Sequence, residues 1–379
     1  MKILTVGKND AGQRLDKFLS KAVKGMPKSF MYKSIRTKKI KLNRRRAEPD
    51  TMLAEGDEIQ LFIRDEFFGS PEDDRGALWR IKPELCVVFE DENIILINKR
   101  PGVLVHEDDE GRDNTLLMHL RAYLCQKGEY DPASEQSFAP SFCNRIDRNT
   151  GGIVIAAKNA AALREMDERI RAREVKKFYL CAVHGVMPKK SDVLEAYLRK
   201  DEKTNTVKVI DSPAPGYLTI KTGYRVLAER DGNSLLEIEL FTGRTHQIRA
   251  HMAHIGHPLL GEGKYGVNRD DRRVGYRWQA LTSYRLRFDF SDDGGVLCAL
   301  KGREFSISPA DVWFCADFGY TVDGGTLGEM PVWKRLLNAF FHAICSGQRM
   351  CTPRFFVPFY QHLIGSIHKQ NSDHMPLHP

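Results

Sequence analysis

A short polar segment, residues 144–152 (NRIDRNTGG), places Asp147 between Arg145 and Arg148. The apolar run that follows, residues 153–157, predicts a buried strand, so the segment is expected to be a loop at a strand end. Flanking positive charges keep a carboxylate ionised at neutral pH, and loops at strand ends often carry catalytic residues. Asp147 is therefore the candidate catalytic carboxylate, although a solvated polar turn would show the same pattern.

Two further segments contain side chains that could take part in binding or catalysis. Residues 175–179 (VKKFY) begin a predicted strand, whose period of two places Tyr179 on the face opposite Phe178. That tyrosine is as consistent with a core position as with stacking on a base. Residues 242–251 (TGRTHQIRAH) span a predicted turn from a strand into a helix. Arg244, in the turn, can reach another loop, or it can contact a phosphate or solvent.

These three segments, in this order, resemble the motifs of the RluA/RluC/RluD family of pseudouridine synthases. The stretch 98–106 (NKRPGVLVH) is similar to the opening motif of that family, and the resemblance covers roughly Gly12–Ile63 and Leu85–Ile307. Four positions depart from the family pattern, and none of them is the aspartate, so we expect altered tuning rather than loss of activity. They are Asn144 for histidine, Ile146 for leucine, Gly151 for serine, and Pro101, which is shifted by one position.

The resemblance implies a role for each candidate residue. Asp147 acts as nucleophile or base, Arg244 pairs with it, and Tyr179 stacks on the uracil. Ile248 forms an apolar floor for the base, and Arg145 and His246 are further candidates for substrate binding. The residues do not decide among attack on C1′, attack on C6 and proton removal from C2′. Because the isomerisation involves no net oxidation, reduction or hydrolysis, no cofactor and no metal are expected.

The net charge of +8 is concentrated at the N-terminus. Residues 1–65 contain 16 Lys/Arg against 8 Asp/Glu, whereas the remaining chain contains 42 of each. A basic module beside a neutral body indicates an electrostatic hold on a polyanion, most simply a nucleic-acid backbone. A solvated basic helix face would carry the same charge.

The pattern of this segment favours RNA binding. Apolar residues at helical spacing predict one helix from Leu15 to Ala22 and a second over Lys28–Arg36, followed by strands near residues 40–43 and 59–63. The arrangement resembles the alpha-L RNA-binding module and presents a group of basic side chains from one end. The candidate RNA-binding residues are Arg36, Lys38, Lys39, Lys41, Arg44, Arg45 and Arg46.

The fold class predicted for the chain is α+β. A mixed, mainly antiparallel β-sheet domain of the pseudouridine synthase type is expected, preceded by a small ααβ RNA-binding module. The domain boundaries follow from composition and resemblance. They are 12–64 for the RNA-binding module, 65–80 for an acidic linker, 81–308 for the catalytic domain and 309–379 for a C-terminal extension of unknown role, with an amphipathic stretch over residues 332–344.

Other features of the sequence bear on the compartment. The eight cysteines form no CxxC pair and indicate a reducing compartment. Apolar runs are far shorter than a membrane span requires, so we expect a soluble, cytoplasmic monomer without a membrane association. Histidines at 246, 251, 254 and 257 lack a Glu or Cys at ligand spacing, so no metal site is expected.

The combined expectation is an RNA pseudouridine synthase whose partner is RNA, most simply large-subunit ribosomal RNA or its precursor particle. One alternative is a synthase of the same class that acts on transfer RNA. Another is a non-catalytic RNA-binding or ribosome-assembly protein that kept the fold. The joint presence of Asp147, Tyr179 and Arg244 favours an enzyme over the second alternative, because binding alone needs no such trio.

Overall fold

The computed structural model describes residues 1–68, 71–107 and 114–320, which belong to one compact unit, Met1–Gly325. The predicted amphipathic stretch 332–344 lies outside the described residues. None of the helices in the described residues has both the length and the hydrophobicity that a membrane span requires.

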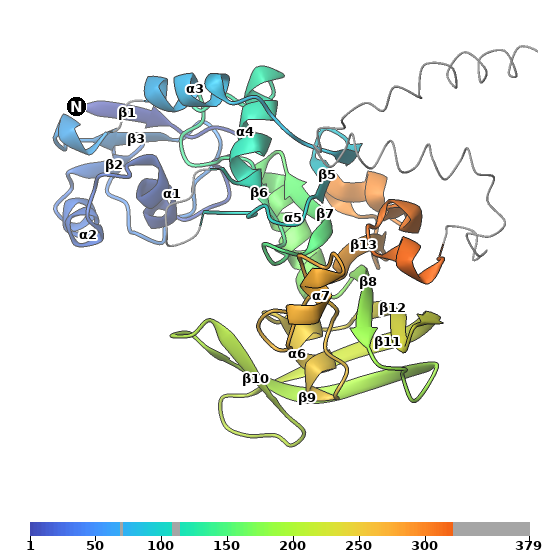
Figure 1. Ribbon diagram of the computed structural model, residues 1–379. Helices are drawn as coiled ribbons and strands as arrows, with labels where there is room; N and C mark the ends of the chain where they lie inside the picture. The colour runs from blue at the N-terminus through green and yellow to red at the C-terminus, as the bar shows by residue number, and fades with distance from the viewer. Residues whose placement is uncertain (69–70, 108–113, 321–379) are drawn as a thin grey trace, which may run out of the picture. The chain divides into compact units, whose positions relative to one another are not determined.

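The basic N-terminal segment folds around a core of its own, formed by apolar residues between Val6 and Leu61. Its strands form a small sheet in the order β1-β3-β2, and its two helices have the predicted positions (Figure 1). Strand β1, at the N-terminus, was not predicted. The elements are β1 (Lys2–Thr5), α1 (Leu15–Ala22), α2 (Lys28–Arg36), β2 (Ile40–Leu42) and β3 (Glu58–Leu61).

The predicted linker contains regular structure. A 3-10 turn, Asp65–Phe67, precedes helix α3, Pro71–Arg80, where the sequence was expected to be irregular. Proline at the first position of a helix is favourable, because its fixed φ suits the helix and the N–H that it lacks would have no partner there. The acidic, glycine-containing composition concealed this helix start.

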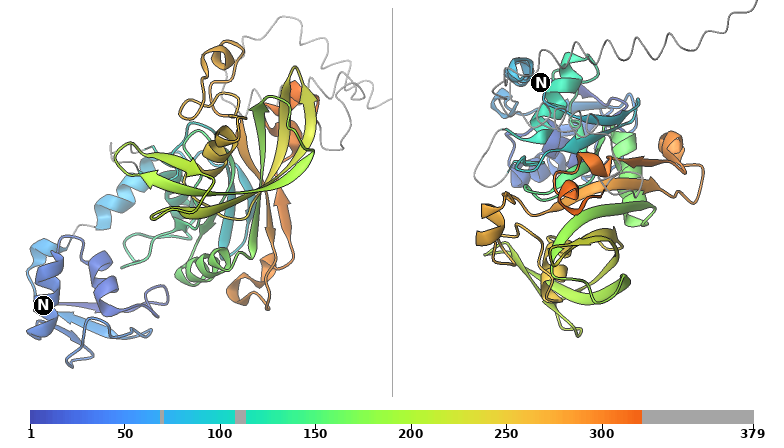
Figure 2. Two further views of the ribbon diagram at one scale, coloured as in Figure 1. Left: turned by 90° about the horizontal axis from the view of Figure 1, so that it is seen from below. Right: turned by 45° about the vertical axis from the view of Figure 1, so that its right-hand side comes forward.

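The second sheet is large and strongly twisted (Figure 2), with eleven strands. The main path runs β10-β9-β11-β12-β8-β13-β7-β5-β4, and only β13 and β7 pair in parallel, which confirms the α+β class and the mainly antiparallel sheet. The strands are β4 (Val87–Glu90), β5 (Ile94–Lys99), β6 (Ser141–Phe142), β7 (Gly151–Ala157), β8 (Val175–His184), β9 (Ser191–Asp201), β10 (Thr206–Ile210), β11 (Leu218–Arg230), β12 (Asn233–Leu240), β13 (Leu281–Phe288) and β14 (Glu304–Ser306).

Helices cover both faces of the sheet at β5 and β7. Alternate residues of these strands pack against α4 (Leu116–Gln126) on one face and α5 (Ala160–Arg171) on the other. All seven residues of β7 are therefore buried. Thr115 caps the N-terminus of α4, and its hydroxyl accepts a hydrogen bond from the Met118 N–H, 3.3 Å away.

The two faces of β8 also pack against different segments. Tyr179 and its alternate neighbours pack against α6 (Gln247–His254), whereas Phe178 and its alternate neighbours pack against residues 309–320. Val312, Phe314 and Phe318 are buried there, so the core takes in chain beyond the predicted domain end at 308. The short helix α7, Arg269–Arg273, lies in the segment between α6 and β13.

Candidate active site

Hydrogen bonds fix the loop that carries Asp147. The Thr150 N–H donates to the Asp147 carbonyl (3.1 Å), and the Thr150 hydroxyl accepts from the Gln279 side chain (3.2 Å). Asn144, which replaces the family histidine, accepts from the Ile155 N–H of β7 (2.8 Å). The asparagine therefore holds the loop against the strand.

Two of the departures from the family motifs meet in space. A Cβ atom on Gly151 would lie 3.3 Å from the ring of Pro101, so the shifted proline occupies space next to the position where the family has serine. The next residue, Gly152, has φ +112°, and a Cβ there would lie 2.1 Å from the Ser283 carbonyl oxygen. Only glycine at 152 allows β13 to pair with β7 beside the Asp147 loop.

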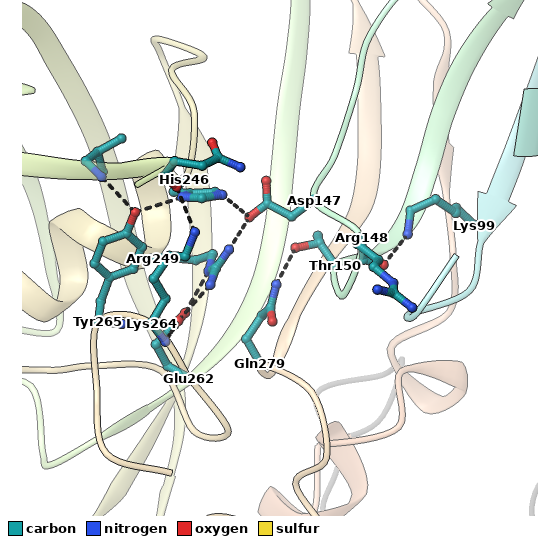
Figure 3. Close-up of polar contacts among 12 residues, drawn as sticks. Lys99, Asp147, Arg148, Thr150, His246, Arg249, Glu262, Lys264, Tyr265 and Gln279 are labelled. Carbon is teal, nitrogen blue, oxygen red and sulfur yellow. Dashed lines mark hydrogen bonds and ion pairs between the residues drawn. The ribbon is translucent and has the colours of Figure 1, made fainter. Parts of the chain in front are cut away.

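Lys99 is buried at the end of β5 and binds the loop that carries Asp147. Its ammonium donates to the carbonyl oxygens of Arg100 (3.1 Å) and Val103 (2.8 Å). It also donates to the carbonyl oxygen of Arg148, 2.9 Å away (Figure 3). Burial lowers the pKa of Lys99 to about 7, and the charge of Asp147 opposes this. Three carbonyls around one nitrogen require three N–H donors, which only the charged ammonium has, so these hydrogen bonds favour the charged form and oppose the effect of burial.

Replacing this lysine tests its structural role. We expect Lys99→Met to lower the free energy of unfolding by about 2–4 kcal/mol, because three carbonyl oxygens lose the buried ammonium that donates to them. Turnover should fall as well, since the Arg148 carbonyl follows Asp147 directly. Urea unfolding of the variant measures the first effect. Lys82→Met, at an exposed position, is the control and should cost less than about 0.5 kcal/mol. Equal stabilities of the two variants would contradict the role of Lys99.

A buried glutamine shapes the turn that precedes α6. The Gln247 side-chain oxygen accepts from the Arg244 N–H (3.1 Å) and from the Thr242 hydroxyl (2.9 Å). Its amide group donates to the Lys221 carbonyl (3.1 Å) and to the Thr222 hydroxyl, which binds the turn to β11. The turn ends at His246, which has the left-handed φ of 52°. As a result, the side chains at 246 and 249 face Asp147.

Asp147 pairs with Arg249, and this corrects the expectation that Arg244 is its partner. Nη1 of Arg249 lies 2.7 Å from Oδ2 of Asp147 (Figure 3). The Arg244 side chain, in contrast, is exposed. Arg249 also forms two hydrogen bonds of 2.7 Å with the buried Glu262. The physical reason is the helix start. Residue 249 lies on the buried first turn of α6, and Arg244 lies in the turn that faces solvent.

The electrostatics of this cluster favour its charged state. Burial alone would lower the pKa of the Arg249 guanidinium, but Glu262 and Asp147 raise it above its usual value. Burial alone would raise the pKa of Glu262, and hydrogen bonding to Arg249 lowers it instead. Both partners therefore stay ionised at neutral pH. The pair Glu262–Arg249 places a fixed cation beside Asp147, which is about a quarter exposed.

The structure brings three other predicted residues to this site. Tyr179 and Ile248 belong to one buried cluster, into which Ile146 also packs. Burial raises the pKa of Tyr179 to about 12, with a smaller contribution of the same sign from Asp147 and an opposing hydrogen bond with Ser283. The phenol is therefore neutral near pH 7. His246 lies 3.9 Å from Asp147, measured from Nε2 to Oδ2.

The remaining predicted residues are placed differently. Arg145 is exposed next to the cluster and does not contact Asp147 through any ion pair recorded among the described residues. Six of the seven basic candidates in the N-terminal segment are exposed, and Lys41 is half-buried, with its ammonium over the ring of Phe62. Within the described chain, only Arg46 of these seven forms an ion pair, with Glu48. Their charges are therefore available to a polyanion.

The other histidines near α6 have individual polar partners. His251, His254 and His257 each accept or donate one hydrogen bond within the protein. Their partners are the Thr222 hydroxyl, the Asp211 carboxylate and the His184 carbonyl. Over residues 1–68, 71–107 and 114–320, no group of three His, Cys, Asp or Glu side chains is arranged to hold a metal.

Sequence reasoning missed three residues of the site: Lys99, Arg249 and Glu262. A signal existed for Arg249, because it follows Ile248 on the helix that the pattern buries, and a buried arginine requires a carboxylate. Lys99 ends an apolar strand, which is an unusual place for a lysine with an exposed role. Glu262 gave no signal, since its segment has no regular period.

The chain is similar in sequence to known proteins. Residues 93–254 match the sequence model of a family described as RNA pseudouridylate synthase. The chain is 33% identical over 291 residues to an uncharacterized RNA pseudouridine synthase of Mycoplasma genitalium, with 75% of this chain and 88% of the relative covered. It is 29% identical over 305 residues to ribosomal large subunit pseudouridine synthase C of Yersinia pestis, with 78% and 90% covered.

A solved structure of human RNA pseudouridylate synthase domain containing 1 is also similar, with 21% identity, a TM-score of 0.49, and 69% of this chain and 98% of that chain covered. The relative that is 33% identical over three quarters of this chain shows that the chain belongs to the family of RNA pseudouridine synthases, of the RluA/RluC/RluD type. It is an isomerase that converts uridine to pseudouridine in RNA.

Proposed function

We propose that this enzyme modifies uridines in large-subunit ribosomal RNA and that Asp147 is the carboxylate that reacts. The observation that supports the role of Asp147 is the placement of its two oxygens. Oδ2 accepts from the buried Arg249, whereas Oδ1 accepts no hydrogen bond from any described residue. One oxygen is held by a cation and the other is free to react, as a nucleophile or base requires.

The proposed chemistry is an isomerisation within one nucleotide. The bond between C1′ and N1 breaks, the uracil turns, and a new bond forms between C1′ and C5. C5 loses a proton and N1 gains one, so atoms and electrons balance without a co-reactant. Asp147 attacks C1′ or C6, or removes the C2′ proton, and all three routes need an ionised carboxylate. Arg249 places a fixed positive charge 2.7 Å from the Oδ2 atom of this carboxylate.

Tyr179 and Ile248 give the proposed pocket its apolar character. Both are buried on the face of the sheet that α6 covers. A uracil released from the ribose must be retained while it turns, and an apolar, enclosed site favours retention over escape to water. The flat phenol of Tyr179 offers a stacking surface, and as a neutral group it does not compete with Asp147 for Arg249.

The proposed substrate rests on two observations. Relatives that share about nine-tenths of their length with this chain are named as synthases for the large ribosomal subunit. The N-terminal segment carries exposed basic side chains, and we propose that it is an RNA-binding module of the alpha-L type. In the same proposal the enzyme acts as a monomer in the cytoplasm, where this RNA is available.

Tritium release tests the substrate. Pseudouridine formation removes the hydrogen from C5, so RNA made with 5-tritiated uridine releases label as each site reacts. We expect release from a large-subunit transcript, with sites then mapped by carbodiimide treatment and reverse-transcription stops. Release from transfer RNA alone would replace the proposed substrate and keep the chemistry. No release from either RNA would contradict both.

The salt dependence of binding tests the basic module. We expect Arg36→Ala/Lys39→Ala/Arg45→Ala to weaken RNA binding. The negative slope of log K against log salt should become shallower by about 2–3, since each lost phosphate contact reduces its magnitude by about 0.7–0.9. These residues avoid Lys38 and Arg44, whose positive φ angles of 63° and 65° disfavour alanine. Anisotropy titrations in KCl measure the slope.

A matched triple outside the module controls for net charge. Lys82→Ala/Arg171→Ala/Lys301→Ala removes three exposed cations as well. We expect its slope to stay within about 0.5 of wild type, because counterions are released only where phosphates are contacted. Equal losses in the two triples would show that general charge, and not the N-terminal segment, holds the RNA.

A further inference from the structure

A chain of polar groups connects the β9–β10 hairpin to the candidate catalytic carboxylate. The Tyr265 hydroxyl oxygen lies 3.0 Å from the backbone nitrogen of Val207, in β10, and 2.7 Å from Nδ1 of His246. The other ring nitrogen of His246, Nε2, lies 3.9 Å from Oδ2 of Asp147. Figure 3 shows Tyr265, His246 and Asp147 in this order.

Donors and acceptors in this chain assign the tautomer of His246. The Val207 N–H can only donate, so the Tyr265 oxygen accepts from it. The Tyr265 hydroxyl hydrogen then needs an acceptor, and among the described residues Nδ1 of His246 is the one within reach. When Nδ1 accepts, the neutral ring carries its proton on Nε2, and that N–H faces Asp147.

The other protonation states of His246 fit less well. A proton on Nδ1 would leave the Tyr265 hydroxyl hydrogen without an acceptor in the described structure. It would also turn the Nε2 lone pair toward a carboxylate oxygen. The doubly protonated ring is disfavoured because burial lowers the pKa of His246. Arg249 and Lys264 lower it further, against the opposing charges of Asp147 and Glu262.

His246 and Arg249 approach the same oxygen of Asp147. Nη1 of Arg249 lies 2.7 Å from Oδ2, and Nε2 of His246 lies 3.9 Å from the same oxygen. An N–H at Nε2 therefore stabilises the orientation of Asp147 in which Oδ2 faces both Arg249 and His246. In this orientation Oδ1 faces away from both side chains. An acceptor at Nε2 would repel Oδ2 and weaken this orientation.

We propose that Tyr265 is a positioning residue for the isomerisation. It fixes the Nε2–H tautomer of His246, which in turn keeps Asp147 oriented with Oδ1 toward the nucleotide. The proposal rests on the proposed role of Asp147. The same hydroxyl accepts a hydrogen bond from the Val207 N–H, and Nζ of the neighbouring Lys264 donates to the Asn205 carbonyl, 2.7 Å away. The segment around Tyr265 therefore also holds the β9–β10 hairpin in place.

The tautomer itself can be measured without turnover. In protein labelled with nitrogen-15 histidine, two-bond proton–nitrogen correlation spectra distinguish protonated from unprotonated ring nitrogens. The signals of His246 are those absent in His246→Gln. We expect Nε2 protonated and Nδ1 unprotonated in wild type, and a mixture of tautomers in Tyr265→Phe. A protonated Nδ1 in wild type would overturn the proposal, whatever RNA the enzyme modifies.

Kinetics separate positioning from packing. Tyr265→Phe removes only the hydroxyl and keeps the ring that packs edge-on against His246. We expect kcat to fall about tenfold with KM within about twofold of wild type, because the orientation of Asp147 matters in the transition state rather than for RNA binding. Tyr217→Phe is the matched control and should leave both constants unchanged.

A double variant provides the decisive comparison. The side-chain amide of His246→Gln supplies an N–H toward Asp147 and has no tautomer to fix, so it should retain more activity than His246→Leu. In the His246→Gln background we expect Tyr265→Phe to change kcat less than about twofold, because the two substitutions remove one shared interaction. The same tenfold loss in both backgrounds would mean that Tyr265 acts through Val207 or packing, and would overturn the proposal.

Discussion

Asp147→Asn is expected to abolish pseudouridine formation while RNA binding and folding stay close to wild type. The amide is similar in size to the carboxylate and removes the charge and the nucleophilic oxygen. Loss of an essential nucleophile or base costs about 10⁴-fold or more in kcat. Tritium release in single turnover measures the loss, and anisotropy titration measures the affinity for the same transcript.

The surroundings of Asp147 explain why the fold should tolerate this change. Arg249 keeps both hydrogen bonds to Glu262 when Asp147 is neutral, so no buried charge loses its partner. The carboxylate itself is about a quarter exposed. We therefore expect a thermal midpoint within about 2 °C of wild type, as for an ordinary surface change. Turnover at the wild-type rate would remove Asp147 from the chemistry and leave the family assignment in place.

The sequence predicted the regular elements well where one period dominated. Strand β8, Val175–His184, begins where the strand was predicted, because its residues are apolar on both faces and its neighbours cover both. Helix α2 also has its predicted bounds, since Pro27 marks its start. The β9–β10 hairpin was missed. Apolar residues fall on both faces of β9 at Val193 and Leu194, which blurs the alternation that identifies a half-buried strand.

The sequence predicted most residues of the site but not the cation that pairs with Asp147. Asp147, Tyr179, Ile248 and His246 were identified from motifs, and the structure places them together. The choice between Arg244 and Arg249 needed the start of α6, which is set by Gln247 through hydrogen bonds to the turn and to β11. The contacts with β11 join residues about 25 positions apart in the chain, and local spacing cannot provide them. The resemblance to the family assigned the partner role to the cation in the turn rather than to the one on the helix.

Arg249→Met is expected to have the second large effect, on both stability and turnover. Glu262 is 1% exposed and would be left as a buried carboxylate without its cation. Breaking a buried pair by removing one partner costs about 3–5 kcal/mol, which urea unfolding measures. Asp147 would also lose the donor on Oδ2, so kcat should fall by about 10²–10³-fold. Arg244→Met is the matched control, and we expect it to leave stability within about 0.5 kcal/mol of wild type.

A compensating substitution separates the two effects of Arg249. In Arg249→Met/Glu262→Gln the buried position carries no charge, and the amide oxygen can still accept the backbone N–H of Lys264, now 2.8 Å from Glu262. We expect most of the lost stability to return, because the uncompensated charge is the main cost. Turnover should stay low, since Asp147 still lacks its cation. If activity returned together with stability, Arg249 would support only the fold, and the cation that serves Asp147 would have to be sought elsewhere, with exposed Arg244 the first candidate.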